Sequence, residues 1–238
     1  DASVNGGCGV NEWSESALMK LLNPGYENES VGGSLYYNNG SGMCYNDKKK
    51  TTTSCDFTIT GLKQNLKSLI GNAVWNTGSN GTNEWKSSTN GLVSHFYEYE
   101  RSSNNGKVCS QDDYCNDTLE RTITWQGHVG LIYPSDYAYA TSERTNCLTK
   151  ELINWSSSSS CMENDWLYYS SVWQWTLSPR ASSTGAYRAF GVSFASYVGD
   201  YGTFYSGIVR PTIYLKSDVM ILTGEGTKDS PYEIGLSE

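Results

Sequence analysis

The sequence predicts a single α+β domain with two main helices, small antiparallel sheets and long loops. Apolar residues recur at helical spacing in two segments, whereas short apolar runs typical of strands occur in the second half of the chain. Stretches rich in Gly, Asn and Ser separate these segments and favour loops. A chain of 238 residues can bury a full core and no clear linker divides it, so we expect one domain over 1–238.

The first half of the chain is predicted to carry both helices. One amphipathic helix is expected to start at Asn11 or Ser14, which are good N-cap residues, and to end after Leu22 at an Asn-Pro-Gly sequence. The second is expected from Thr60 or Gly61 to about Trp75, where leucine, isoleucine and valine recur at helical spacing. The remaining segments of this half are assigned by composition, with loops over 26–55 and 76–90 and a short element over 95–101.

The second half is predicted to supply the strands. The run Val129–Ile132 is typical of a short buried strand, and Tyr133–Tyr137 after it is rich in turn residues. The run Trp173–Leu177, which is rich in tryptophan, is expected in the core. Towards the end of the chain we expect a strand over Thr212–Leu215, a turn over Gly224–Thr227 and a last short element over Tyr232–Ile234.

Composition and charge limit the functional classes. The net charge is −8 and the only cationic run, Lys48-Lys49-Lys50, lies in a polar loop, so we expect no nucleic-acid partner. Ser, Thr, Asn, Gly and Tyr dominate, as is common in secreted and cell-surface proteins rich in β-structure. No run approaches the roughly 20 apolar residues of a membrane span, and we expect no signal peptide in this sequence. Asp1 is expected to be the start of a processed or truncated ectodomain.

Seven cysteines are many for a cytosolic protein of this size and favour disulfides. The most local choice of partners closes three loops, through Cys44–Cys55, Cys109–Cys115 and Cys147–Cys161. Cys8 is then left over, either free or paired with a partner outside this chain. No CxxC pair occurs, and His95 and His128 each stand alone, so we expect no metal and no other cofactor.

Catalytic motifs are missing from the sequence. Neither histidine lies in a nucleophile motif such as GxSxG, so Ser-His-Asp catalysis is not expected. A glycosidase pair of carboxylates can form from any two acids that converge in space, but no motif marks one here. The segment Glu163-Asn164-Asp165-Trp166 has oxygens suited to Ca²⁺ but lacks the order of a lectin calcium loop. We therefore expect no enzymatic activity and no catalytic residue.

Residues 180–207, which we call the aromatic segment, are the most informative part of the chain. The segment lies between two apolar blocks, Trp175–Pro179 and Val209–Lys216, and consists almost entirely of Tyr, Phe, Ser, Gly, Ala and Thr, as antibody paratopes do. It contains no Lys, Glu, Gln, Met or Trp. Codons whose third base is fixed as C, and whose first two bases vary, cannot encode any of these five residue types. Mutagenesis that targets the adenines of AAC-type codons would therefore produce the same absence. The composition indicates a recognition surface, and a set of twisted, Gly-rich strands with aromatic cross-strand pairs is the alternative.

Strand alternation divides the aromatic segment into two faces. Phe190, Val192 and Val198 are expected to point inward. The outward set is expected to comprise Ala189, Gly191, Ser193, Tyr197, Gly199 and Tyr201. Outward aromatic rings among small residues make a shallow surface suited to a sugar face or a protein epitope.

An ordered series of motifs resembles a known family. The series comprises Gly130–Ala140, Trp175–Pro179, Val209–Ser217 and Gly224–Thr227 followed by Ser230-Pro231-Tyr232. It is similar to the C-terminal ectodomain of prepilin-like surface proteins from low-GC Gram-positive gut bacteria. The first predicted helix and Asn72–Trp75 fit that family too, so the resemblance covers most of the chain. It implies attachment to a membrane or pilus through a hydrophobic N-terminal helix, a segment that is absent from this sequence.

The end of the series also resembles C-type lectin-like domains of the formylglycine-generating type. In these domains a Trp-rich strand, a variable loop segment and a Val-Arg-Pro strand build the ligand face. Variable proteins of diversity-generating retroelements use this fold, and adenine-templated mutagenesis targets their surface near the C-terminus. No Cys follows Cys161, so formylglycine-generating activity is not expected. The resemblance implies a C-type lectin-like fold and a ligand face made of Tyr187, Arg188, Ser193, Phe194, Tyr197, Asp200, Tyr201, Phe204 and Tyr205, with Arg180 at its edge.

The resemblance and the composition together imply a surface-exposed binding protein. Its ligand is expected to be a protein or glycan on another cell, a phage or a host, and its aromatic segment is expected to be diversified by a retroelement. Two alternatives stay open. In one, the chain is a fixed-sequence, structural pilin-like subunit that assembles through the aromatic segment; in the other, it is a carbohydrate-binding module of fixed specificity. The sequence does not name the ligand.

Overall fold

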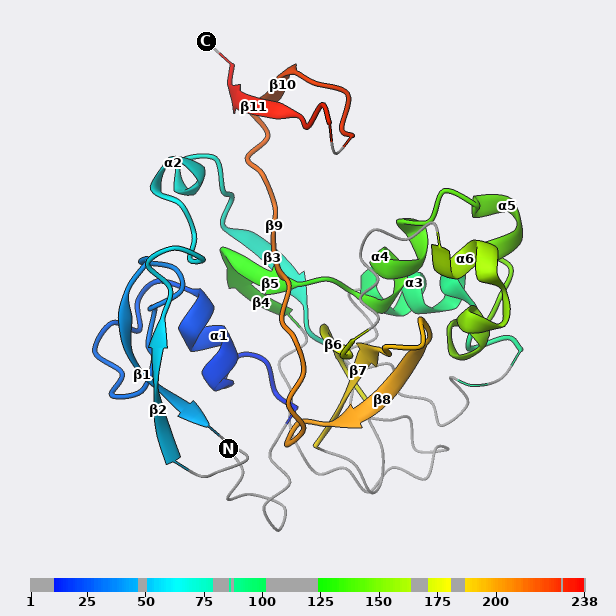
Figure 1. Ribbon diagram of the computed structural model, residues 1–238, viewed down its shortest axis with the longest axis horizontal. Coiled ribbons are helices and arrows are strands. Elements are labelled where there is room, and N and C mark those ends of the chain that lie inside the picture. Colours follow the sequence, from blue (N-terminus) through cyan, green and yellow to red (C-terminus); the bar gives the residue numbers. More distant parts are fainter. Residues whose placement is uncertain are drawn as a thin grey trace.

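The computed structural model describes residues 11–46, 51–78, 86, 88–101, 124–163, 171–180, 187–227 and 229–237. Short helices and small antiparallel sheets in these ranges confirm the α+β class (Figure 1). The helices are α1 (Ala17–Leu22), α2 (Gln64–Lys67), α3 (Val93–Arg101), α4 (Pro134–Tyr139), α5 (Arg144–Cys147), the 3₁₀ helix η2 (Leu152–Ser157) and α6 (Ser159–Glu163). The strands are β1 (Ser41–Asn46), β2 (Thr51–Asp56), β3 (Ala73–Asn76), β4 (Thr124–Gly127), β5 (Val129–Leu131), β6 (Gln174–Pro179), β7 (Arg188–Val192), β8 (Val198–Gly202), β9 (Pro211–Ile213), β10 (Val219–Thr223) and β11 (Glu233–Leu236).

Two hydrophobic clusters form the core of the described residues. The first, which we call the helical core, lies among α3, α4, η2 and the inner face of β7–β8, and is centred on Phe96, Tyr137, Trp155 and Phe190. The second, which we call the strand core, surrounds β5 and contains Trp75. In Figure 1 the helices α3 to α6 lie on one side of the central strands, α1 and β1–β2 lie on the other, and β10–β11 projects away from both. No helix in the described ranges is long and apolar enough to cross a membrane.

The first predicted helix exists but begins later than expected. α1 starts at Ala17, with the Ser16 hydroxyl accepting a hydrogen bond from the Met19 backbone N–H at 3.0 Å. The chain before it turns, because a Glu12 carboxylate oxygen accepts from the Ser14 backbone N–H at 2.9 Å. Ser14 is therefore held in this turn and does not cap the helix.

The second predicted helix is largely wrong. Only the single turn α2 is helical, and 73–76 forms β3, which pairs with β4. Trp75 is buried, and its indole Nε1 donates to the Gly127 carbonyl at 3.0 Å. The pairing with a strand distant in sequence thus overrides the helical spacing of the apolar residues. The longest helix of the described ranges is α3, which the sequence indicated only as a short element.

Two segments expected as irregular chain form regular structure. The predicted loop 26–55 includes β1 and most of β2, which make an antiparallel hairpin. The predicted turn Tyr133–Tyr137 is the start of α4, where Pro134 occupies the first helical position and an Asp136 carboxylate oxygen accepts from the Tyr133 N–H at 2.9 Å. The strand expectations agree better with the structure, because β5 lies within Val129–Ile132 and β9 overlaps the expected strand Thr212–Leu215. The segment Trp173–Leu177, expected in the core, forms most of β6, and Gly224–Thr227 lies in the connection between β10 and β11.

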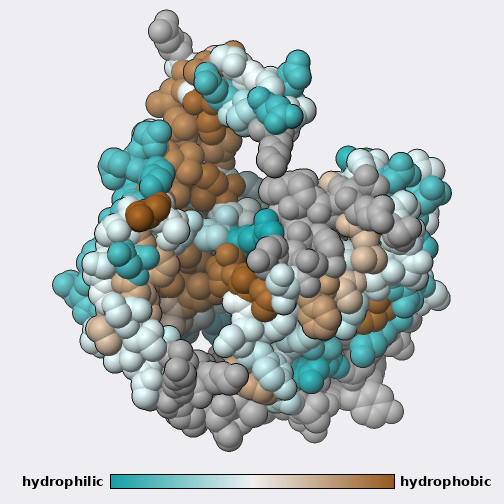
Figure 2. Space-filling view, viewed as in Figure 1, coloured by the Kyte–Doolittle hydropathy of each residue, from teal (hydrophilic) through white to brown (hydrophobic). Residues whose placement is uncertain are grey.

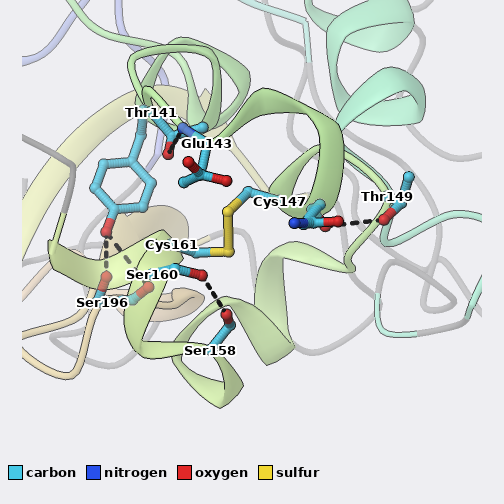
Figure 3. The surroundings of a disulfide bond; sticks show 10 residues. Thr141, Glu143, Cys147, Thr149, Ser158, Ser160, Cys161 and Ser196 are labelled. Atoms are coloured by element: carbon cyan, nitrogen blue, oxygen red, sulfur yellow. Dashed lines mark hydrogen bonds between the residues drawn. A yellow bond between two sulfur atoms is a disulfide. The ribbon is translucent and has the colours of Figure 1, made fainter.

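Two of the three predicted disulfides are present. Cys44–Cys55 joins β1 to β2, and Cys147–Cys161 joins α5 to α6 inside the helical core. Figure 3 shows the second bond next to the Ser158–Ser160 hydrogen bond, with Ser196 from the β7–β8 turn close by. Several residues singled out in the sequence lie outside the described ranges, namely Cys8, the Lys48–Lys50 run, Cys109, Cys115 and Asn164–Trp166.

Glu100 is a carboxyl group buried between α3 and α4. It accepts hydrogen bonds from the Ser135 backbone N–H at 3.2 Å and from the Ser135 hydroxyl. Burial raises the pKa of Glu100 to about 8; the negative charge of Asp136 also raises it, whereas the Ser135 hydrogen bonds and Arg101 oppose the shift. The folded protein therefore holds Glu100 protonated at neutral pH.

We expect this group to make stability fall as pH rises. Between its ordinary pKa of 4.5 and about 8, the unfolded chain loses the Glu100 proton while the folded chain keeps it, so the free energy of unfolding decreases across this window. Thermal unfolding measured from pH 5 to 8 should show a midpoint falling by several degrees. Glu100→Gln should flatten this slope, and Glu225→Gln, at an exposed site between β10 and β11, should leave it unchanged. Equal slopes in the wild type and Glu100→Gln would contradict the assignment.

Candidate ligand-binding face

The hairpin β7–β8 of the three-stranded sheet β6–β7–β8, with its turn, carries most described residues of the aromatic segment. Arg188 pairs with Gly202 at one end of β7–β8, and Val192 pairs with Val198 next to the turn. Phe190, Val192 and Val198 are buried in the helical core, which confirms their predicted inward orientation. The ring of Phe190 packs edge-on against Phe96 of α3, with 5.2 Å between ring centroids. This packing fixes the position of the hairpin against the helices.

The opposite face of this sheet holds stacked aromatic rings. Trp173 stacks on Tyr201, with 4.7 Å between centroids and 19° between planes, and it packs edge-on against Trp175 at 4.1 Å. Gly191 makes room for this stack, because a Cβ there would lie 3.1 Å from the Trp173 ring and 3.2 Å from the Tyr201 ring. Burial raises the pKa of Tyr201 to about 12, Tyr197 raises it further and a hydrogen bond from Ser193 opposes the shift. Tyr201 is therefore half-buried in the stack.

The turn between β7 and β8 is held from beneath. Ser193 is only 1% exposed, which corrects its expected outward orientation. Its hydroxyl accepts from the Ala195 N–H at 3.1 Å and so folds back into the turn. Ser196 adopts a left-handed backbone with φ 63°, and its hydroxyl lies 2.5 Å from the Tyr137 hydroxyl in the helical core. Phe194, at the tip, remains 58% exposed.

Three predicted ligand contacts bind one another. The Asp200 side chain is 8% exposed and pairs with Arg188 at 2.5 Å and with Arg180. Burial raises the pKa of Asp200, but the hydrogen bonds and charges of both arginines outweigh it, so the pKa is lowered overall. The Asn11 side-chain amide donates to the Arg180 carbonyl at 2.9 Å and to the Arg188 carbonyl. These contacts close the end of the sheet opposite the turn, and contact of the three charged side chains with a ligand stays a prediction.

A second group of aromatic rings lies at that same end. Phe204 packs against Tyr187 at 6.0 Å and against Tyr205 at 4.4 Å between centroids. The Thr203 N–H donates to the Tyr187 carbonyl at 2.7 Å, which continues the pairing of β7 with β8. Tyr205 is 56% exposed, whereas Phe204 and Tyr187 are half-buried. The predicted aromatic side chains are thus distributed along the hairpin from its tip to its open end.

Sequence reasoning missed three contributors to this face. Trp173 and Trp175 lie outside the aromatic segment but form the stack with Tyr201. Their signal in the sequence was the alternation Trp-Gln-Trp, which places both rings on one side of a strand. Asn11 was expected only as a helix cap, and its actual contact with the sheet carries no sequence signal.

The described side chains of this face are mainly aromatic rings and small residues, which offer contact area to a ligand. Among the described residues, no three His, Cys, Asp or Glu side chains lie close enough to hold a metal ion. No protein-family model, curated protein or solved structure matches the chain. The resemblance to prepilin-like proteins, the C-type lectin-like fold and the lack of enzymatic activity therefore stay predictions.

Substitutions should separate the exposed rings from the stacked one. Phe194→Ser and Tyr205→Ser remove side chains that are more than half exposed, so we expect the thermal midpoint to change little. Tyr201→Ser removes the partner of Trp173 and should lower the free energy of unfolding by about 1–2 kcal/mol. Denaturant unfolding of the three variants tests this order. Equal destabilisation of all three would show that the exposed rings also support the fold.

Proposed function

We propose that this protein is a surface-exposed ligand-binding protein whose aromatic segment forms a diversified contact face. The observation that carries the proposal is that the two sides of the β7–β8 hairpin have different surroundings. Its inner residues pack in the helical core, with half-buried Tyr197 against them, while its turn and open end present Phe194 and Tyr205 among small residues. Tyr and Phe on a rigid support give large contact area at low entropic cost.

The proposed C-type lectin-like fold is consistent with the order of elements around this face. The Trp-rich β6 precedes the aromatic segment, and β9, which follows it, pairs with β5 so that Val129 lies opposite Ile213. The aromatic segment is thereby held at both ends by strands of the core. The two described disulfides support a location on the cell surface or a pilus, because such bonds persist in oxidising compartments.

Sequencing the gene across its source population, with any near-copy of its 3′ end, tests the proposal. Variation should be confined to 180–207 at adenines of the template copy and should follow exposure. Exposed or half-buried positions should vary, namely Tyr187, Phe194, Tyr197, Tyr201, Phe204 and Tyr205. Phe190, Val192, Ser196 and Val198 should stay constant, because each is buried beneath the face. An invariant segment, or variation spread evenly along the chain, would overturn diversification.

A structural pilin-like subunit is the second candidate, and the C-terminal hairpin favours it. β10–β11 projects from the body in Figure 1, and its apolar residues are exposed (Met220, Ile221, Leu222 and Leu236). A two-stranded hairpin with exposed apolar residues has little intrinsic stability in water, so contact with another chain would stabilise it. Self-association of the protein together with an invariant aromatic segment would support this candidate over the first.

A further inference from the structure

A groove separates the start of α1 from the outer side of β6 and β7. Its volume is about 830 Å³, which falls within the range of small-ligand and peptide pockets. Figure 2 shows the molecule hollowed between these two parts, with apolar residues beside the hollow. Ala189 and Thr203 are its only described lining residues from the aromatic segment. The groove is thus formed mainly by residues outside the aromatic segment.

The two walls of the groove are mainly apolar. Leu18 of α1 and Val31 of the following loop line one side. Trp175, Leu177 and Pro179 of β6 line the other. Apolar side chains of a ligand would lose water-exposed area against both walls, which is the main source of favourable binding energy.

Charge on the lining selects a cation. Glu12, Glu15 and Glu29 line the groove together with one base, Lys20, which gives a formal charge of −2 (three carboxylates against one ammonium). The Glu12 carboxylate already accepts hydrogen bonds from the Ser14 N–H and hydroxyl, so Glu15 is the carboxylate best placed to pair with a ligand cation. Lys20 lies 3.5 Å from Glu29 and so offsets that carboxylate. The whole chain carries −8, so its long-range field has the same sign. An Arg guanidinium fits this lining best, because it pairs with carboxylates and stacks on indole rings such as that of Trp175.

The groove also offers a hydrogen-bond donor. Trp13 lines it, and within the part of the chain that the structure describes no acceptor pairs with its buried indole Nε1. A buried donor without a partner costs about 1–3 kcal/mol. For a peptide carbonyl in the groove to accept this hydrogen bond, the indole, which packs edge-on against Trp125 with 5.8 Å between centroids, must rotate towards it; a simple organic cation has no acceptor to offer.

We propose that this groove binds an extended peptide segment in which an Arg side chain lies between apolar residues. The apolar walls take the flanking side chains, the acidic lining takes the guanidinium and the Trp13 N–H donates to a backbone carbonyl. The inference stands apart from the proposed function, because it requires neither a diversified segment nor a lectin-like fold.

Titration calorimetry of the whole chain with acetyl-Leu-Arg-Leu-Arg-Leu-amide tests the proposal. We expect saturable binding that weakens with added salt, and no binding of the matched peptide in which Glu replaces Arg. Glu15→Lys should weaken binding roughly tenfold, because it replaces an attraction by a repulsion in the groove. Glu98→Lys makes the same change in net charge on α3, outside the groove, and should leave the affinity within about twofold.

Several outcomes would overturn the proposal. These are no saturable binding at millimolar peptide, equal binding of the Arg and Glu peptides, and equal effects of Glu15→Lys and Glu98→Lys. Binding of arginine amide as tight as that of the pentapeptide would show that the groove takes a small organic cation instead. Phe194→Ser should leave pentapeptide binding unchanged, so failure of the diversified face and failure of the groove are distinguishable.

Discussion

The burial of one side of the β7–β8 hairpin in the helical core is the constraint on which the rest of the face depends. Phe190, Val192 and Val198 are fully surrounded there, and the Tyr137 contact with Ser196 holds the turn down. Successive side chains in a strand point to opposite faces, so fixing one side leaves the other to project away from the core. The position of the outer rings is therefore set by the buried side of the hairpin. The outer rings themselves contribute only part of the stability of the hairpin.

Local patterns in the sequence predicted which residues of the hairpin point inward. They did not predict pairing between segments that are far apart in the sequence. Alternation along β7 and β8 has a period of two and needs only neighbouring residues, so the inward set was predictable. The segment 73–76 has helical spacing, and its strand structure depends on β4 and on Trp75 reaching the Gly127 carbonyl. No local pattern contains that partner. The start of α4 differs, because its signals are local: Pro134 at the first helical position and the Asp136 carboxylate bonded to the Tyr133 N–H were interpreted as turn residues.

The composition of the sequence predicted where the candidate face lies, but it predicted less well which of its side chains point outward. The aromatic segment indicated recognition, and its exposed tip and open end agree with an outward face. The side chains of Ser193 and Asp200 are buried because each has a closer partner, a turn N–H for the first and two arginines for the second. Trp173 and Asn11 belong to the site through contacts between segments far apart in sequence. The groove escaped prediction for the same reason, since its walls come from both halves of the chain.

Close packing of rings on glycine limits how much of the aromatic segment can change without loss of the fold. A Cβ at Gly191 would lie 2.8 Å from the Gln174 carbonyl oxygen, and one at Gly202 would lie 2.3 Å from the Phe204 ring. The Gln174 carbonyl belongs to the backbone and cannot move aside. The Phe204 ring lies at a more open site and can move. Gly191 is therefore part of the scaffold, although it lies on the same face as Tyr201. A diversified face on this hairpin must consist of positions whose side chains neither fill the core nor lie beneath a neighbouring ring.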